Sequence, residues 1–189
     1  MSQDNPLLLS ADQSLLILVD VQVRLAAAMP DADRARVLRQ GAALLRGADL
    51  LQVPVIVSEQ YPKGLGHTEP ALAETFPAAA AVVEKTCFAC SGETRFREAL
   101  AGHGRRQVVV AGMEAHVCVL QTALELHAAG HEVFVVEDAV SSRDPANRDN
   151  AMARLRQAGV AVTNTESVLF EWLRDASHTQ FKAVSALIK

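Results

Sequence analysis

The sequence predicts an α/β fold: a single doubly wound domain in which a six-stranded, mostly parallel sheet carries helices on both faces. Six short runs of β-branched and other apolar residues alternate with longer stretches whose apolar residues recur every three or four positions. Several of these runs are apolar at nearly every position, as in strands that are buried on both faces. Gly130 and Gly159 each separate a helical stretch from a strand, where a left-handed glycine commonly ends a helix.

The expected elements follow one another in a regular order. Strands are expected at residues 15–19, 53–57, 81–83, 107–111, 132–136 and 160–162, and helices at residues 31–51, 94–101, 115–129 and 146–158. Proline and glycine interrupt the segment 60–77, so we expect a long loop near a sheet edge, with at most a short helix at 71–75. The chain has 189 residues, half of them hydrophobic, which is enough to bury one substantial core. We therefore expect residues 1–189 to form one domain.

The C-terminal segment carries apolar residues at helical spacing. They are Phe181, Ala183, Val184, Leu187 and Ile188. A terminal apolar helix docks either on its own domain or on a neighbouring subunit. The second arrangement makes a homo-oligomer, a dimer or a larger assembly, which is the state we expect.

Composition and charge exclude several classes of partner. The formal net charge of −4 offers no basic field that would attract nucleic acid or an anionic membrane surface, so we expect a small-molecule substrate. The apolar runs are too short to cross a bilayer, and residues 1–5 lack the cationic stretch that opens a secretion signal. Three cysteines, an odd number, fit a reducing compartment better than a disulfide framework. These features predict a cytoplasmic protein.

Three chemically useful side chains stand where expected strands end. Asp20 follows the first strand, Lys85 follows the third, and Cys118 falls in the first turn of the helix after the fourth. In doubly wound parallel sheets, ligands bind outside the carboxyl ends of the strands, where the strand order reverses. Taken singly, each residue has a structural explanation, because Asp20 could cap a helix, Lys85 could face solvent and Cys118 could be a small buried side chain. Their convergence at one edge favours an active site.

A cysteine in the first turn of a helix lies near the positive end of the helix dipole, which favours its thiolate. Backbone N–H groups in the same turn can hold the oxyanion of a tetrahedral intermediate. We therefore expect Cys118 to be the nucleophile of an acyl-transfer reaction. Asp20 would take its proton, and Lys85 would stabilise both negative charges.

Three motifs resemble the isochorismatase-like hydrolase family, a cysteine hydrolase superfamily that includes nicotinamidases and N-carbamoylsarcosine amidohydrolases. They are LILVDVQ at 16–22, EK at 84–85 and AGMEAHVCVLQTA at 111–123, and the segment QYPKGLGHT at 60–68 is most similar to isochorismatase domain-containing proteins of uncertain substrate. The resemblance spans nearly the whole chain. It implies a catalytic triad of Asp20, Lys85 and Cys118, the sheet order 3-2-1-4-5-6 and a homo-oligomer.

The same resemblance implies further details of the site. A cis peptide bond between Met113 and Glu114 would aim the N–H of Glu114, beside that of Cys118, into an oxyanion hole. Metal-binding nicotinamidases carry an Asp-x-His pair after the second strand, whereas this chain has SEQY at 58–61 and only His67 nearby. Zinc needs three or four ligands. No metal and no cofactor are therefore expected, and nicotinamide is a doubtful substrate.

The wider pocket and the type of reaction stay open. Gln22, Tyr61, Phe88 and His116 lie near the motifs and are candidates to bind substrate, although each could equally be ordinary packing. The CFAC sequence at 87–90 suggests a thiol-disulfide oxidoreductase, but no proline occurs between residues 77 and 145 to face such a pair. We expect hydrolysis of an amide-type C–N bond through a thioester. The alternatives are vinyl-ether hydrolysis of an isochorismate-like substrate and a non-catalytic binding or scaffold protein.

Overall fold

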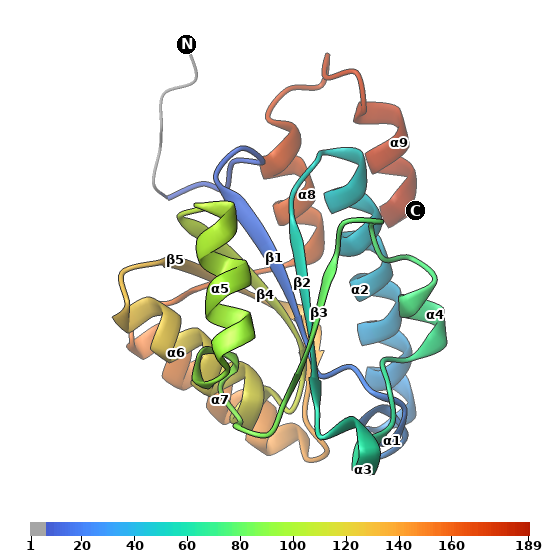
Figure 1. The fold of residues 1–189 in the computed structure, drawn as a ribbon. Coiled ribbons are helices and arrows are strands. Elements are labelled where there is room, and N and C mark those ends of the chain that lie inside the picture. The colour runs from blue at the N-terminus through green and yellow to red at the C-terminus, as the bar shows by residue number, and fades with distance from the viewer. Residues whose placement is uncertain (1–6) are drawn as a thin grey trace.

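The structure is a computed structural model that describes residues 7–189, so the expectation drawn from residues 1–5 lies outside it. Its core is a six-stranded sheet in the order β3-β2-β1-β4-β5-β6 (Figure 1). All neighbouring strands are parallel. The strands are β1 (Ser14–Val19), β2 (Val55–Gln60), β3 (Ala81–Lys85), β4 (Gln107–Met113), β5 (Glu132–Ser141) and β6 (Ala161–Thr163). The predicted fold class and strand order are confirmed.

Helices cover both faces of the sheet. They are α1 (Val23–Ala27), α2 (Asp31–Leu50), α3 (Pro62–Leu65), α4 (Pro70–Ala73), α5 (Thr94–His103), α6 (Leu120–Ala128), α7 (Pro145–Gln157), α8 (Thr165–Leu173) and α9 (Phe181–Ser185). A π-helical turn, Ala115–Val119, leads into α6, and short 3₁₀ turns occupy Cys90–Gly92 and Ala186–Ile188. No helix within residues 7–189 combines the length and the apolar character needed to cross a membrane.

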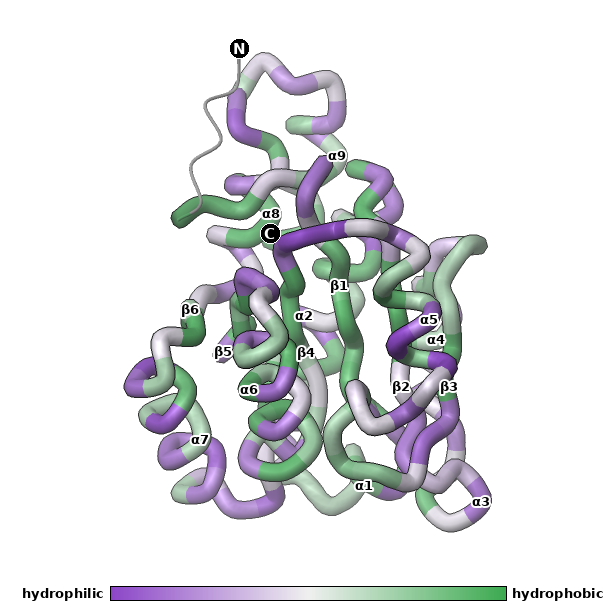
Figure 2. Tube along the Cα trace, turned by 60° about the vertical axis from the view of Figure 1, so that its left-hand side comes forward, coloured by the Kyte–Doolittle hydropathy of each residue, from purple (hydrophilic) through white to green (hydrophobic). Residues whose placement is uncertain are grey.

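Side-chain alternation along the central strands builds two apolar layers. Leu16 and Leu18 of β1 pack with α2, α8 and α9, whereas Leu15, Ile17 and Val19 pack with α5, α6 and α7. This division follows from the two-residue period of a strand. Figure 1 shows the two groups of helices on opposite sides of the sheet, and Figure 2 shows hydrophobic residues along β1 and β4 in its middle. The two central strands are therefore held between two packed layers of helices, which fixes the positions of their carboxyl ends.

Local sequence signals explain several helix boundaries. The side chain of Asp144 accepts a hydrogen bond from the N–H of Ala146 at the start of α7, with Pro145 in the first helical position. Gly130 and Gly159 have φ values of +94° and +86°, as predicted for residues that leave a helix for a strand. The C-terminal segment packs on its own chain, where Val184 is fully buried, so this segment does not itself indicate a second subunit.

The segment expected to be a loop is more helical than predicted. It contains α3 and α4, each with proline in its first turn, where the missing N–H costs no helical hydrogen bond. The short helix expected around 71–75 is present as α4, one residue earlier at its start, whereas α3 was not expected. Helix α8 was not expected at all, although Asn164 caps its start by accepting a hydrogen bond from the N–H of Ser167.

Gly112 allows β4 to approach β1 closely at the end of the sheet where both strands stop. Its φ is +142°, and an added Cβ would lie 2.1 Å from the carbonyl oxygen of Val19. Substitution of Gly112 by alanine is therefore expected to lower the free energy of unfolding by on the order of 3 kcal/mol, through strain and overpacking.

Gly102 provides the matched control for this prediction, because an added Cβ there meets nothing within 4 Å. It lies inside α5, so Gly102→Ala is expected to stabilise by roughly 0.5–1 kcal/mol through helix propensity. Urea denaturation of the two variants measures both values. Equal effects of the two substitutions would show that the contact at Gly112 is unimportant.

Candidate active site

The candidate site lies where β1 and β4 end side by side. Val19 pairs with Gly112 on one side and with Ser58 of β2 on the other. After β1 the chain leads to helices on one face of the sheet, and after β4 it leads to α6 on the other face. Such a reversal opens a crevice at the carboxyl ends of the strands. Asp20 and the turn that carries Cys118 stand at its two sides.

Asp20 and Lys85 form a buried ion pair in this crevice. The Nζ of Lys85 lies 2.7 Å from Oδ2 of Asp20, and both side chains are completely buried. Asp20 has a φ of +51°, a left-handed conformation that aspartate tolerates better than most residues. Burial is the largest single influence and would lower the pKa of Lys85, but the charge of Asp20, the nearby thiols of Cys90 and Cys118 and the hydrogen bond to Asp20 together outweigh it and raise this pKa. Lys85 is therefore held as a cation.

Lys85 has no hydrogen-bonding capacity to spare. Besides Asp20, its ammonium group contacts Oε1 of Gln60 at 2.7 Å and the carbonyl oxygens of Cys87 and Phe88 at 3.2 Å and 3.1 Å. These four acceptors exceed its three N–H donors. The lysine therefore fixes the chain after β3 and acts on its surroundings through its charge.

Cys118 lies in the π-helical turn and is only 4% exposed. Burial raises the pKa of its thiol, the negative charge of Asp20 raises it further, and Lys85 opposes the shift. The expectation that the helix terminus favours a resting thiolate is therefore wrong, because desolvation and the carboxylate outweigh the dipole. Attack by Cys118 needs a base that removes the proton, and Asp20 is within electrostatic range.

The three cysteines are free, and they have different surroundings. Cys90 is fully buried, and its sulfur contacts the hydroxyl of Ser58 at 3.4 Å. The sulfur of Cys87 lies against Gly92, where an added Cβ would be 2.9 Å away. The thiol of Cys90 thus lies on the side of the ion pair, whereas the thiol of Cys87 lies against the 3₁₀ turn that contains Gly92.

The turn before Cys118 differs from the predicted geometry. No peptide bond among residues 7–189 is cis, so the bond between Met113 and Glu114 is trans and that expectation is wrong. The chain turns instead through a left-handed Glu114 with φ +56°. The Glu114 carboxylate accepts a hydrogen bond from Nε of Arg143 at 2.9 Å, and Nδ1 of His116 contacts Oγ of Ser142 at 2.9 Å.

The other predicted substrate-binding residues divide into two groups. Gln22 is fully buried, and its amide bonds to the backbone of Gln60 and to the carbonyl of Gly66, so it fastens two segments together. Nothing in this arrangement turns its side chain toward a ligand. Tyr61 and Phe88 are each 54% exposed beside Lys85, and Tyr61 has a left-handed φ of +38°. Exposed aromatic rings at the edge of a buried charge pair can contact substrate.

Glu59 fastens the segment after β2, a role that sequence reasoning missed. Its Oε1 accepts hydrogen bonds from the N–H and the hydroxyl of Thr68, and its Oε2 lies 2.8 Å from Nδ1 of His67. Burial alone would raise the pKa of Glu59, but the hydrogen bonds from His67 and Thr68 outweigh it and lower this pKa. Within residues 7–189, no cluster of three or more metal-ligating side chains includes His67.

The hydrogen bonds of Glu59 with His67 and Thr68 lead to a prediction about stability and pH. Because the pKa of Glu59 is lowered from 4.5 on folding, its contribution is complete above that value and is lost as the pH falls through the folded pKa. Glu59→Gln should destabilise the protein by roughly 1–2 kcal/mol at pH 7, and by less at pH 3.5. Chemical denaturation at both values measures the difference, and a penalty that is independent of pH would contradict the assigned role.

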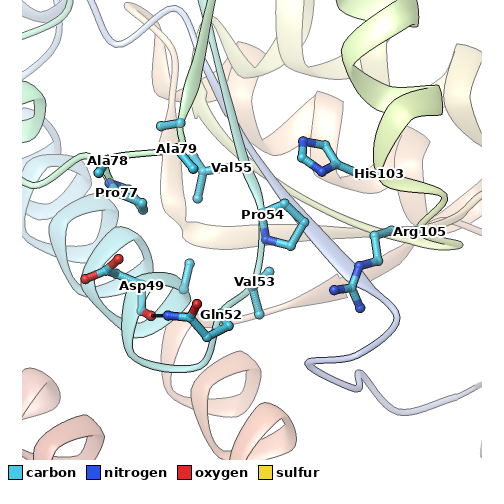
Figure 3. Close-up of a pocket in the computed structure, with 12 residues that line it drawn as sticks. Asp49, Gln52, Val53, Pro54, Val55, Pro77, Ala78, Ala79, His103 and Arg105 are labelled. Atoms are coloured by element: carbon cyan, nitrogen blue, oxygen red, sulfur yellow. Dashed lines mark hydrogen bonds between the residues drawn. The ribbon is translucent and has the colours of Figure 1, made fainter.

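Two cavities lie at opposite ends of the strands, one at their amino ends and one at their carboxyl ends. One of about 430 Å³ lies at the amino end of β2, where Asp49 and Gln52 face His103 and Arg105 across apolar residues (Figure 3). It is remote from Asp20, because Val55 begins the strand whose other end pairs with Val19. The second, of about 310 Å³, lies at the carboxyl end. It is lined by Tyr61, Pro62, Lys63, Glu84, Lys85, Thr86 and Glu93. This second cavity adjoins the ion pair.

The chain is similar to several known proteins. Residues 14–167 match the family model described as Isochorismatase domain. Isochorismatase domain-containing protein 2A of Mus musculus is 38% identical over 179 residues, which cover 94% of this chain and 84% of the mouse protein. The structure described as MAR1 ribonuclease from Caenorhabditis elegans has a TM-score of 0.90 and 35% identity, covering 95% of this chain and 91% of that one.

Two solved YcaC structures add chemical context. YcaC from Pseudomonas aeruginosa, solved with hexane-2,5-diol and covalent acrylamide, has a TM-score of 0.84 and 28% identity, covering 95% of this chain and 91% of that one. YcaC from Escherichia coli, described as an octameric hydrolase of unknown specificity, has a TM-score of 0.85 and 27% identity. The match covers 96% of this chain and 89% of that one. The match over residues 14–167 shows that the chain belongs to the isochorismatase domain family, and its sheet order and likeness to these structures show that it has the family's hydrolase fold.

Proposed function

We propose that this protein is a cysteine-dependent hydrolase that cleaves an amide-type C–N bond of a small molecule through a thioester. The observation that carries the proposal is the completely buried Asp20–Lys85 pair, 2.7 Å long, whose charges act on the thiol of Cys118. A buried ion pair costs desolvation energy and is weak evidence of stabilisation. Its place beside a nucleophile at the carboxyl edge of the sheet favours a catalytic use.

The first half of the reaction forms the thioester. Asp20 takes the proton of Cys118 as the sulfur attacks the substrate carbonyl, so the resting thiol needs no depressed pKa. The N–H of Cys118, in the π-helical turn, holds the oxyanion of the tetrahedral intermediate. The expected second donor, the N–H of Glu114, was assigned on a cis bond that is trans here, so it is left out of this step. When the C–N bond breaks, Asp20 returns the proton to the departing nitrogen, and ammonia or an amine leaves.

The second half regenerates the enzyme. Asp20 takes a proton from water as the water attacks the thioester carbonyl, and the C–S bond breaks to release a carboxylic acid product. Asp20 then returns its proton to the sulfur. Lys85 stays protonated throughout and offsets the negative charge that moves between Asp20 and Cys118. No metal or cofactor takes part in these steps.

The site favours a small reacting group on the substrate. Because Cys118 is only 4% exposed, the reacting carbonyl must be small enough to reach a buried sulfur. The exposed rings of Tyr61 and Phe88, whose backbones contact Lys85, are the proposed contacts for the rest of the substrate. His116, anchored through Nδ1 to Ser142, is available to bind the polar end of the substrate. The covalent acrylamide in the Pseudomonas aeruginosa relative supports a site for small molecules, since acrylamide is small and its alkene carbon adds to nucleophiles such as thiols.

We further propose a homo-oligomer, by likeness to the octameric relative from Escherichia coli. The three free cysteines support a cytoplasmic location. The formal net charge of −4 gives no support for RNA as a substrate, which is relevant because one relative is described as a ribonuclease.

A screen of small primary amides, comparing the wild-type protein with Cys118→Ala, tests the proposed function. Release of ammonia by the wild type alone is the expected result. Cleavage of an isochorismate-like vinyl ether that survives in Cys118→Ala would favour the alternative hydrolase, because that reaction needs no thiol. A folded protein that turns over neither class would favour a binding or scaffold role.

A further inference from the structure

Two side chains of β2 hold the two members of the buried ion pair. Ser58 and Gln60 are two residues apart, so they share one face of the strand. The hydroxyl of Ser58 donates a hydrogen bond to Oδ1 of Asp20 at 2.7 Å, while Oε1 of Gln60 accepts one from Nζ of Lys85 at 2.7 Å. The adjacent Glu59 faces the other way and fastens the segment at residues 67–68. One strand end thus contacts the acid and the cation separately.

Ser58 fixes the direction in which the carboxylate of Asp20 can accept a proton. Lys85 occupies Oδ2, and Ser58 occupies Oδ1, so rotation of the carboxylate would break one of two charge-assisted hydrogen bonds. The Ser58 hydroxyl is itself oriented, because its oxygen contacts the thiol of Cys90 at 3.4 Å. The remaining acceptor positions of the carboxylate therefore keep a constant direction in the site.

Gln60 fixes the direction of the ammonium group of Lys85. Its Nε2 donates to the carbonyl oxygen of Thr86, which leaves Oε1 directed at Lys85. Its backbone is fastened to the amide of Gln22 through its N–H at 2.7 Å and through its carbonyl oxygen at 3.0 Å. The acceptor for Lys85 is thus fixed by three further contacts.

We propose that Ser58 and Gln60 are positioning residues, which hold Asp20 and Lys85 in the geometry that lets Asp20 take the proton of Cys118. This inference rests on the proposed function and deepens it, since neither residue needs to touch the substrate. A purely structural role would give the same hydrogen bonds but would change only stability. A positioning role also changes the reactivity of Cys118.

The rate at which acrylamide alkylates Cys118 tests the proposal without knowledge of the natural substrate. Peptide mass spectrometry after timed exposure gives a rate for each cysteine separately. Ser58→Ala is expected to slow alkylation of Cys118 about ten-fold, a part of the 10²–10⁴-fold that a positioned base contributes. Ser58→Thr, which keeps the hydroxyl, should recover the rate to within about three-fold of wild type.

Gln60 gives a parallel pair of variants. Gln60→Met has a similar length without the acceptor oxygen, and it is expected to slow alkylation by about the same factor as Ser58→Ala. Gln60→Glu keeps an acceptor for Lys85, and it should react faster than Gln60→Met.

Ser14 is the matched control for stability. It is a buried serine at the other end of the sheet, where its hydroxyl accepts a hydrogen bond from Nε1 of Trp172 at 2.9 Å. Ser14→Ala should lower the melting temperature as Ser58→Ala does and leave the rate at Cys118 unchanged. A folded Ser58→Ala variant that reacts at the wild-type rate would overturn the positioning role alone. Wild-type protein that reacts no faster at Cys118 than unfolded protein would instead overturn the proposed function.

Discussion

Replacement of Cys118 by alanine is expected to abolish turnover, with kcat reduced by roughly 10⁴-fold or more, because no other group can form the thioester. Lys85 cannot substitute for the sulfur, since its ammonium group is held as a cation and all its N–H groups are hydrogen-bonded, and Asp20 is needed as the base. Steady-state release of ammonia from the best amide of the screen measures the loss. Cys118 occupies an apolar cluster, so the variant should also be somewhat less stable and must be assayed below its melting temperature.

Cys87 supplies the thiol control for this prediction. It is half-buried, its sulfur lies against Gly92, and only its backbone carbonyl contacts Lys85. Cys87→Ala should therefore retain kcat within about two-fold of wild type. Residual turnover of more than about one per cent in Cys118→Ala would remove the sulfur from the mechanism.

Removal of one charge from the buried Asp20–Lys85 pair should have the second largest effect, on both stability and turnover. Asp20→Asn leaves Lys85 as an uncompensated cation that is completely buried, which costs about 3–5 kcal/mol in comparable cases. Asparagine suits this test because it tolerates the left-handed φ of +51° at position 20. Urea denaturation measures the loss, and turnover should vanish with it.

A double variant separates the loss of stability from the loss of turnover. Asp20→Asn combined with Lys85→Met removes both charges from the crevice, so we expect it to recover most of the lost stability, about 2 kcal/mol or more. It should remain inactive, because no base is left. Additive losses of stability in the double variant would show that the two side chains do not depend on each other, against the 2.7 Å contact.

The fold was predictable because its signals are local and periodic. Continuous apolar runs indicate strands buried on both faces, and β1 and β4 are buried along their whole length. Glycines at 130 and 159 indicate where helices end, and both have the expected positive φ. The position of Asp20, Lys85 and Cys118 at strand or helix ends follows from these boundaries together with the rule for parallel sheets.

The residues that support the site were not predictable in the same way. The second strand was expected to end at residue 57, so Ser58 fell outside it and Gln60 was assigned to the loop at 60–77. The two residues were therefore not recognised as sharing one face of a strand. An extension of the two-residue period by three positions would have placed both on the side of Asp20. The protonation of Cys118 depends on burial and on a carboxylate 98 residues away in the chain, so sequence position alone gave the wrong direction.

The structure also explains why the proline-rich segment was misjudged. Pro62 and Pro70 stand in the first turns of α3 and α4, where proline is favoured, although the same residues interrupt a helix elsewhere. Glu59 and Gln22 then fasten this segment to the sheet through side-chain hydrogen bonds. Such contacts between distant residues leave no periodic signal in the sequence.

The most direct measurement is the mass of the protein trapped during turnover of an amide. We predict a covalent adduct equal to the acyl group of the substrate, attached to the peptide that contains Cys118 and released by water as the carboxylic acid. The adduct should be absent from Cys118→Ala and should form more slowly in Ser58→Ala. Product formation without any acyl adduct on Cys118, under quenching fast enough to stop hydrolysis, would contradict thioester chemistry at this site.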